Sequence, residues 1–160
     1  MQKNDRKFHM RRKDKEITDL GKIEEVIEKV TVCRLGLVDN DEPYVVPVNF
    51  GYERNAIYFH SALEGRKIDI IKKNNKVCFE IDTDVEAKTE KSSCDTVKYR
   101  SVLGTGRVHI LESKEEKIHG LKSIMRQCTR GEYSFSEDRL DSVLVLRIDI
   151  ESVTGKQSGY

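Results

Sequence analysis

Apolar residues in the first part of the chain recur at the spacing of one helix face. Between residues 18 and 30 they lie three or four positions apart, at Ile23, Val26, Ile27 and Val30. This spacing predicts a helix over 18–30, with Thr18 as its N-cap. Two further stretches with helical spacing, 65–73 and 114–128, predict two more helices.

The other apolar runs are rich in β-branched and aromatic residues, which is typical of strands. They lie at 31–38, 44–52, 56–60, 76–82, 97–111 and 143–150. Turn residues at 39–42 and 53–55 separate the first three runs, which predicts two successive hairpins and antiparallel pairing. The polar stretch 84–95 predicts a surface loop, and Gly104 and Gly106 predict a bulge or sharp bend in the fifth strand.

The order of these elements predicts the fold class. A helix is followed by three strands, a helix, two strands, a helix and a last strand. Six mostly antiparallel strands in 160 residues favour a closed or partly closed barrel, because closure removes exposed strand edges. We therefore predict a single α+β domain over 1–160, in which helices flank a mainly antiparallel, six-stranded barrel.

Charge and hydropathy limit the kinds of partner. With 29 basic and 28 acidic residues the net charge is +1, which argues against nucleic acid and anionic membranes as partners. No signal peptide or long apolar stretch is visible, so we expect a cytoplasmic protein with reduced thiols. The local exception is a basic N-terminal arm over 1–17. It is either a solvated arm or one that folds over a bound anion or a partner subunit.

The four cysteines are not spaced for zinc or thioredoxin-type chemistry, because none forms a Cys-x-x-Cys pair. We predict no metal site. Cys33 and Cys78 lie in apolar strand runs and are expected to be small core residues, and Cys128 lies on the apolar face of the third helix. Cys94, in the polar loop, is the expected reactive thiol.

The junction between the third strand and the second helix is suited to bind a phosphate group. The strand ends at His60, Ser61 follows with a hydroxyl group, and Gly65 precedes the basic pair Arg66 and Lys67. Free N–H groups at a helix start point toward an anion, and the helix dipole adds attraction. An arginine can grip two phosphate oxygens and a lysine adds a point charge. The alternative is an ordinary strand–helix turn with two solvated basic residues.

The second strand contains Pro47, which cannot donate to a strand ladder and so should lie at an edge or at a bulge. A bulge would free main-chain groups near Val46, Val48 and Asn49, and such groups can bond the polar edge of a ring system. The alternative is a buried strand with a kink.

Taken in order, these stretches resemble the pyridoxamine 5′-phosphate oxidase-like flavin-binding split barrels, and within them the nitroimidazole-resistance branch. The segments that carry the similarity are 10–17, 33–38, 44–52, 57–61, 65–67, 99–102 and 154–156. They cover nearly the whole chain, and the ordered set is specific although no single segment is.

The resemblance implies a protein that holds FMN, or the longer FAD, through the flavin phosphate and without a covalent bond. Arg66 and Lys67 would hold the phosphate, with His60 and Ser61 lining the same pocket. Ser101 would reach the cofactor from the adjacent strand. The residues implied along the isoalloxazine ring, mainly through main-chain groups, are Val46, Pro47, Val48 and Asn49. The family also forms homodimers with two flavins at the interface, which implies that some contacts cross subunits.

The chain departs from the oxidases proper, which carry an arginine and a lysine where it has Tyr44 and Asn49. The C-terminal arginine and histidine pattern that binds the pyridoxal substrate is also missing. We therefore expect an FMN-dependent oxidoreductase that reduces a small-molecule electron acceptor, such as a nitroaromatic or nitroimidazole compound, with NAD(P)H as electron source.

His60 is compatible with several roles. It is a hydrogen-bonded histidine at a strand end, a donor to the phosphate or the flavin edge, or an axial haem ligand. Because histidine can titrate near neutral pH, it is also our candidate for a catalytic proton donor. Two functions remain as alternatives to the oxidoreductase: a module that stores or senses flavin without turnover, and a haem-binding split barrel.

Overall fold

The computed structural model describes residues 10–87, 97–129 and 136–160. In these residues lie the helices α1 (Leu20–Glu28), α2 (Arg66–Lys73) and α3 (Lys114–Cys128), and the 3-10 helices η1 (Lys13–Lys15) and η2 (Glu137–Ser142). The strands are β1 (Glu16–Ile17), β2 (Val32–Asp39), β3 (Glu42–Glu53), β4 (Ala56–Ser61), β5 (Lys76–Ala87), β6 (Val97–Ile110) and β7 (Leu144–Ser158). Cys94, residues 1–9 of the basic arm and most of the expected 84–95 loop lie outside the described residues.

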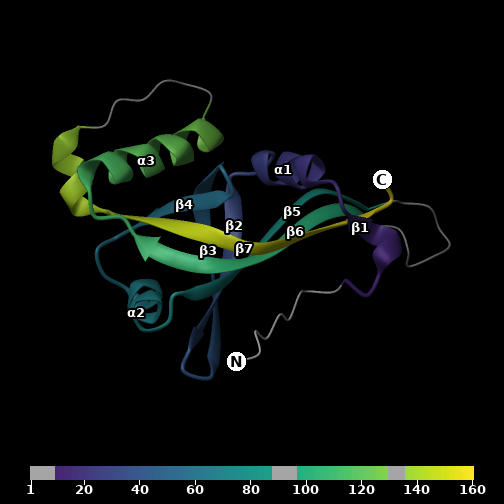
Figure 1. Ribbon diagram of the computed structural model, residues 1–160, viewed down its shortest axis with the longest axis horizontal. Coiled ribbons are helices and arrows are strands. Elements are labelled where there is room, and N and C mark those ends of the chain that lie inside the picture. Colours follow the sequence, from purple (N-terminus) through teal and green to yellow (C-terminus); the bar gives the residue numbers. More distant parts are fainter. Residues whose placement is uncertain (1–9, 88–96, 130–135) are drawn as a thin grey trace.

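The strands form one antiparallel sheet that closes on itself (Figure 1). Their order is β1-β7-β4-β3-β2-β5-β6, and β6 pairs again with β7, so that the strands β2 to β7 make a ring. The short strand β1 pairs with the last part of β7. Tight hairpins join β2 to β3 and β3 to β4. In the second hairpin, Arg54 and Asn55 both have positive φ angles, of 51° and 62°, as a two-residue hairpin turn requires.

The predicted fold class is confirmed: helices flank a mainly antiparallel barrel, and the six predicted strands are present. The two-residue strand β1 is a seventh, which falls in the stretch predicted as arm. Strands β5 and β7 also run past their predicted ends, into polar residues, because main-chain pairing with β6 continues beyond the core. The N-cap of α1 is Asp19 rather than Thr18, since the Asp19 carboxylate accepts a hydrogen bond from the N–H of Gly21 at 2.8 Å.

Alternate residues of each strand point into the ring and form the main core, where Phe50, Phe59 and Phe79 are fully buried. The same alternation corrects the prediction for Cys78. Cys33 is buried, but Cys78 lies on the outer face of β5 and is exposed. The register of β6 against β7 shifts between Thr105 and Gly106, so an irregularity lies at the predicted place, but the extra residue, Glu151, is on β7.

The helices differ in where they pack. Residues of α1 and α2 join the main core: Ile23, Val26, Ile27, Ile68, Ile70 and Ile71. Helix α3 instead lies across β3, β4 and β7 (Figure 1), over a second core that includes Tyr58, Leu121, Ile124 and Val145. None of the helices in the described residues is long and apolar enough to cross a lipid bilayer.

Candidate functional site

The ring is split where β3 and β4 diverge. The two strands pair only from Phe50↔Phe59 to Glu53↔Ala56, so residues 43–49 of β3 pair with β2 alone. Phe50 donates its N–H to the carbonyl oxygen of Thr31, on the β2 side. Since main-chain groups alternate in direction along a strand, Val45, Pro47 and Asn49 turn theirs to the open edge.

Pro47 therefore lies at an edge and not at a bulge. The β2–β3 register is unbroken from Val32↔Asn49 to Asp39↔Glu42. Pro47 lacks an N–H group, but at this position the group would point to the open edge, so no hydrogen bond between strands is lost. Of the two positions predicted for Pro47, an edge or a bulge, the structure shows the edge, and the free main-chain groups come from the departure of β4.

The strand–helix junction predicted to bind a phosphate group, called the cradle below, lies beside this edge, at the start of α2. Gly65 is the N-cap and has a φ of 138°, a conformation that favours glycine. The N–H groups of Ile68 and Asp69 both donate to its carbonyl oxygen, at 2.9 and 3.1 Å. The N–H groups of Arg66 and Lys67, one residue earlier in the turn, point out of the helix start, where an anion can accept from them.

The two basic side chains of the cradle have different surroundings. The Arg66 guanidinium lies 4.8 Å from the centroid of the Tyr44 ring, and its Nε is 3.6 Å from Oδ2 of Asp39. Lys67 is half-buried, with its Nζ 5.9 Å from the centroid of the Phe59 ring. Burial lowers the pKa of Lys67, because it disfavours the charged form of the amine, and a nearby anion would act in the opposite direction.

Ser61 and His60 do not share a face. Ser61 is buried and points the same way as Phe59, into the ring. His60 is exposed and points the same way as Tyr58, toward the side of the sheet that α3 covers. The cradle therefore lies next to Ser61, and the His60 side chain faces away from it.

The predicted ring-contacting residues alternate in the same manner. Val46 and Val48 turn inward, and Pro47 and Asn49 turn outward. The Asn49 amide donates to the Thr31 carbonyl oxygen at 3.2 Å. Main-chain groups of Pro47 and Asn49 are thus open to a ligand, and those of Val46 and Val48 face β2.

Ser101 lies far from the cradle within one chain. It is on the outer face of β6, opposite Asp82 and Lys156. Arg66 contacts Asp39 at one end of β2, whereas the β5 and β6 residues next to Ser101 lie toward the other end. A single chain does not bring Ser101 and Arg66 together.

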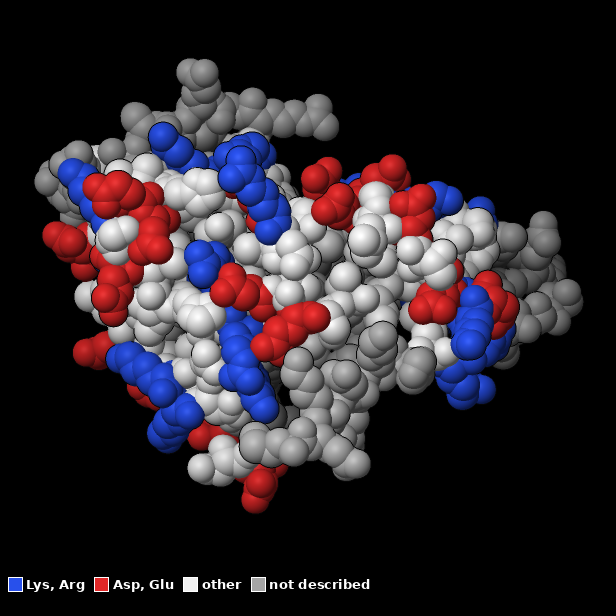
Figure 2. Space-filling view, viewed as in Figure 1, with Lys and Arg blue, Asp and Glu red and all other residues white. Residues whose placement is uncertain are grey.

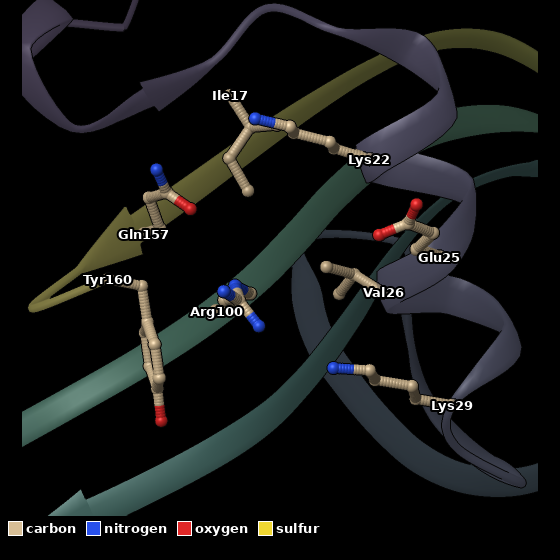
Figure 3. A pocket seen from close by; sticks show the side chains of 8 residues that line it. All are labelled: Ile17, Lys22, Glu25, Val26, Lys29, Arg100, Gln157 and Tyr160. Carbon is tan, nitrogen blue, oxygen red and sulfur yellow. The ribbon is translucent and has the colours of Figure 1, made fainter.

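A polar hollow near the C-terminal residues is lined by several charged side chains (Figure 3). It measures about 190 Å³ and lies between α1 and the ends of β6 and β7. Lys29 and Arg100 both contact Oδ2 of Asp84, at 3.0 and 2.7 Å, and the Arg100 guanidinium stacks 4.2 Å from the Tyr160 ring centroid. These contacts, that of Lys29 first, lower the pKa of Asp84. The basic side chains Lys29 and Arg100 that line the hollow are therefore already paired within the chain.

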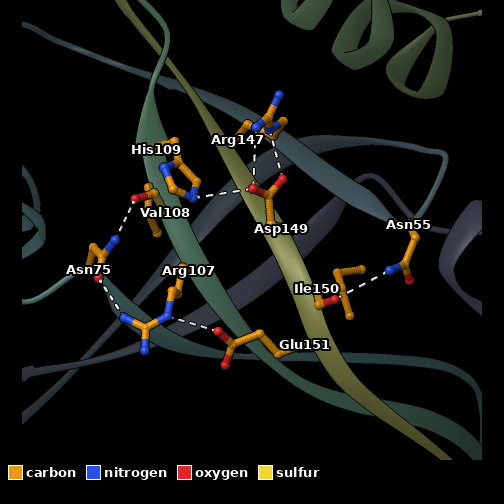
Figure 4. Close-up of polar contacts among 9 residues, drawn as sticks. All are labelled: Asn55, Asn75, Arg107, Val108, His109, Arg147, Asp149, Ile150 and Glu151. Carbon is orange, nitrogen blue, oxygen red and sulfur yellow. Dashed lines mark hydrogen bonds and ion pairs between the residues drawn. The ribbon is translucent and has the colours of Figure 1, made fainter.

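Charged side chains on the outside of β6 and β7 also pair with one another (Figure 4). Asp149 lies 2.8 Å from Nε of Arg147 and 3.2 Å from Nε2 of His109. Glu151 accepts a hydrogen bond from Arg107 at 2.8 Å. The contacts of Asp149 with His109 and of Glu151 with Arg107 join β7 to β6, and the contact of Asp149 with Arg147 lies within β7.

Sequence comparison decides the family. The sequence model of the pyridoxamine 5′-phosphate oxidase family matches residues 19–157. The chain belongs to that family. The match spans the cradle, the open β3 edge and all three α-helices.

Solved structures agree with this assignment. The chain is similar to a proposed 5-nitroimidazole antibiotic resistance protein of Bacteroides thetaiotaomicron, with 35% identity and a TM-score of 0.81 over 89% of this chain and 86% of that one. An FAD-binding protein of Mesorhizobium loti is 23% identical, with a TM-score of 0.67 over 90% and 97% of the two chains. The FAD and heme binding protein of Mycobacterium smegmatis shares the fold at 15% identity, with a TM-score of 0.81 over 91% and 74%.

A curated relative is also similar, an uncharacterized protein of Rhizobium meliloti that is 30% identical over 94 residues. The matched residues make up 59% of this chain and 58% of that relative. The chain thus matches a little over half of the length of the curated relative.

Two residues at the cradle were not predicted to contact Arg66. Asp39 was assigned only to a turn, and Tyr44 only marked a departure from the oxidases. Both lie near the β2–β3 hairpin, more than 20 positions before Arg66 in the sequence. Only the packing of α2 against β2 brings them together.

Proposed function

We propose that the chain binds a flavin through its phosphate at the start of α2. The observation that carries the proposal is the convergence of the Gly65 N-cap, the outward N–H groups of the first turn, and the side chains of Arg66 and Lys67. The N–H groups of the first turn and the side chains of Arg66 and Lys67 are all donors, which is the set that a phosphate group requires. Because the set suits one phosphate group, we propose FMN rather than FAD.

The open edge of β3 suggests where the ring system of the cofactor would lie. Tyr44, on the same strand, already contacts Arg66, so the edge leads away from the cradle. Val45 and Asn49 offer N–H groups and Pro47 a carbonyl oxygen, which suit the polar rim of an isoalloxazine ring. When bound, the flavin supplies the redox chemistry, and these residues bind it and orient it.

We further propose that the protein is an oxidoreductase that reduces small organic acceptors such as nitroimidazole compounds, with NAD(P)H as reductant. The 35% identical Bacteroides protein, proposed to act in 5-nitroimidazole resistance, supports this choice of acceptor. Tyr44 and Asn49, uncharged where the oxidases proper carry basic residues, argue against pyridoxamine phosphate oxidation.

The test is the absorption spectrum of the freshly purified protein, with the released cofactor identified by chromatography. We expect a flavin spectrum and released FMN, and bleaching of the flavin by NAD(P)H that a nitroimidazole reverses. A colourless protein that does not take up added FMN would contradict flavin binding. A Soret band would indicate haem instead. A flavoprotein that NAD(P)H does not reduce would be a flavin store or sensor.

We also propose a homodimer, formed through the outer face of β2, β3 and β6. Exposed apolar side chains gather there: Val32, Val38, Val45 and Leu103, with exposed fractions of 41–64%. Val38 pairs with Pro43, Val32 with Asn49 and Val45 with Gly36, whereas Leu103 pairs with Glu80 of β5, the strand that lies between β2 and β6. Ser101 lies on the same face, so a second chain could bring its Ser101 toward the open edge of the first.

A charge placed in this face should dissociate the dimer. We expect sedimentation at twice the chain mass of 18.5 kDa for the wild type, and a shift toward the single chain for Val45→Asp. Leu20→Asp is the matched control, because Leu20 is equally exposed but lies on α1, outside the face. A wild type that sediments as one chain would contradict the proposal.

A further inference from the structure

A second cleft lies on the far side of the barrel from the cradle. It measures about 940 Å³ and is formed by α1, α3 and the last residues of β3. This volume is in the range of small-molecule sites. Tyr52, which lines it, is eight residues along β3 from Tyr44, a separation of about 27 Å in an extended strand. The cleft is therefore separate from the proposed flavin site.

The two walls of the cleft carry opposite charge. Glu24 and Glu28 lie one turn apart on α1, next to Lys29, whose ammonium group is paired with Asp84. Arg126 of α3 and Arg54 of the hairpin line the opposite side. In Figure 2, acidic side chains gather over α1 and basic ones over the neighbouring end of α3. A ligand that lies between the walls meets a negative surface on one side and a positive surface on the other.

The walls are held in place by hydrogen bonds between side chains and the main chain. The Gln127 side chain of α3 accepts a hydrogen bond from the Tyr52 N–H at 2.7 Å and donates to the carbonyl oxygens of Ile27 and Val30, at 2.9 and 2.7 Å. One side chain thus ties α3 to β3 and to the end of α1. The Tyr52 hydroxyl donates to Glu24 at 2.8 Å, so the cleft is formed before any ligand binds.

Glu53 holds the Arg126 side chain of the basic wall in place. Its side chain is 19% exposed, and its Oε2 lies 3.5 Å from a terminal guanidinium nitrogen of Arg126 and 3.3 Å from Nε2 of His119. Arg126 itself is 64% exposed, so its other donors remain open to the cleft.

Ser123 supplies a polar group that the fold does not use. It lines the cleft and is 2% exposed, and within the described residues its hydroxyl has no hydrogen-bond partner. The helix backbone at Ser123 lies close to Gly51, and the Ser123 side chain is buried beside this contact. Alanine would fit equally well, so packing accounts for the size of Ser123 but not for its hydroxyl. Buried hydroxyls are normally paired, which indicates a partner from outside the chain.

We infer that this cleft binds a small zwitterion of the amino-acid class, with its ammonium group against Glu24 and Glu28 and its carboxylate against Arg126 and the Ser123 hydroxyl. A ligand with a single charge would satisfy one wall only. A zwitterion places each of its groups against the opposite sign and suits charge-assisted hydrogen bonds at both ends.

The direct test is a titration of the ¹⁵N-labelled full chain with L-glutamine and with glycylglycine, two zwitterions of different length. We expect saturable shifts of the amide signals of Tyr52, Ser123 and Gln127 with at least one of them. Acetate and methylammonium, which carry one charge each, should bind at least about tenfold more weakly. Flavin is not needed, so the result is independent of the cofactor proposal.

Variants inside and outside the cleft test whether the zwitterion binds there. Glu28→Gln and Arg126→Gln should each weaken binding about tenfold or more, and Ser123→Ala a few-fold. Glu25→Gln and Lys122→Gln change the same charges on the same helices outside the cleft and should leave binding unchanged. The inference is overturned if neither zwitterion gives saturable shifts, if acetate binds as tightly as the zwitterions, or if Glu25→Gln weakens binding as much as Glu28→Gln.

Discussion

Replacing Arg66 and Lys67 together by alanine should weaken flavin binding by about 100-fold or more, because hydrogen bonds between charged groups each contribute about 1.5–3 kcal/mol. Both side chains start from the first turn of α2, where the N–H groups alone would still attract a phosphate. Residual, weak binding is therefore expected rather than none. The measurement is the FMN content of the purified protein, followed by titration of the apoprotein with FMN.

The matched control is Lys72→Ala with Lys73→Ala. These residues lie in the last turn of the same helix and are exposed, so the variant loses the same amount of charge far from the cradle. It should keep the full complement of flavin. If the Arg66 and Lys67 variant also purifies with full flavin, the phosphate is bound elsewhere and the cradle assignment is wrong.

The largest effect on stability is expected for Gly51→Ala. A Cβ atom at Gly51 would lie 2.3 Å from the carbonyl carbon of Ser123 and 2.4 Å from the N of Ile124. Both are main-chain atoms of α3, so no side-chain rotation relieves the clash, and the whole helix must move away from β3. We expect the free energy of unfolding to fall by about 3 kcal/mol, measured by urea denaturation.

Gly21→Ala is the control for that prediction. Its added Cβ would lie 3.2 Å from Oδ1 of Asp19, the far end of a side chain. Alanine also favours the helix by up to about 1 kcal/mol, so the midpoint of unfolding should change little or rise. A Gly51→Ala variant as stable as Gly21→Ala would contradict the close packing of α3 on β3.

The sequence predicted the fold wherever local pattern and tertiary structure agree. Helix α3 has the predicted bounds, and β2 to β4 lie between turns whose residues favour tight hairpins. The missed parts depend on non-local pairing. Strand β1 is too short to show a period, and the far end of β7 is polar but is held by β6. The position of Pro47 at an edge depends on where β4 departs, which no local signal records.

The candidate site was predictable only where its residues are sequence neighbours. Ser61, Arg66 and Lys67 stand within one strand–helix junction, and the structure keeps them on one side of the sheet. Adjacency misled for His60, since neighbouring strand residues point to opposite faces. The alternation of strand side chains between two faces could have been applied to the sequence, and it would have placed His60 and Ser61 on opposite faces. The zwitterion cleft could not be predicted, because Glu28, Glu53 and Arg126 come from three distant segments.

The closure of the ring has a consequence for biosynthesis. Strand β7, whose 15 residues come last among the described strands, pairs with both β4 and β6. Until it is synthesised, those two strands present unpaired edges, which are templates for association with other chains. A nascent chain can form the β2–β3–β4 hairpins early, but the barrel closes only after β7 leaves the ribosome. Slow translation before residue 144 therefore prolongs the period in which the chain is prone to aggregate.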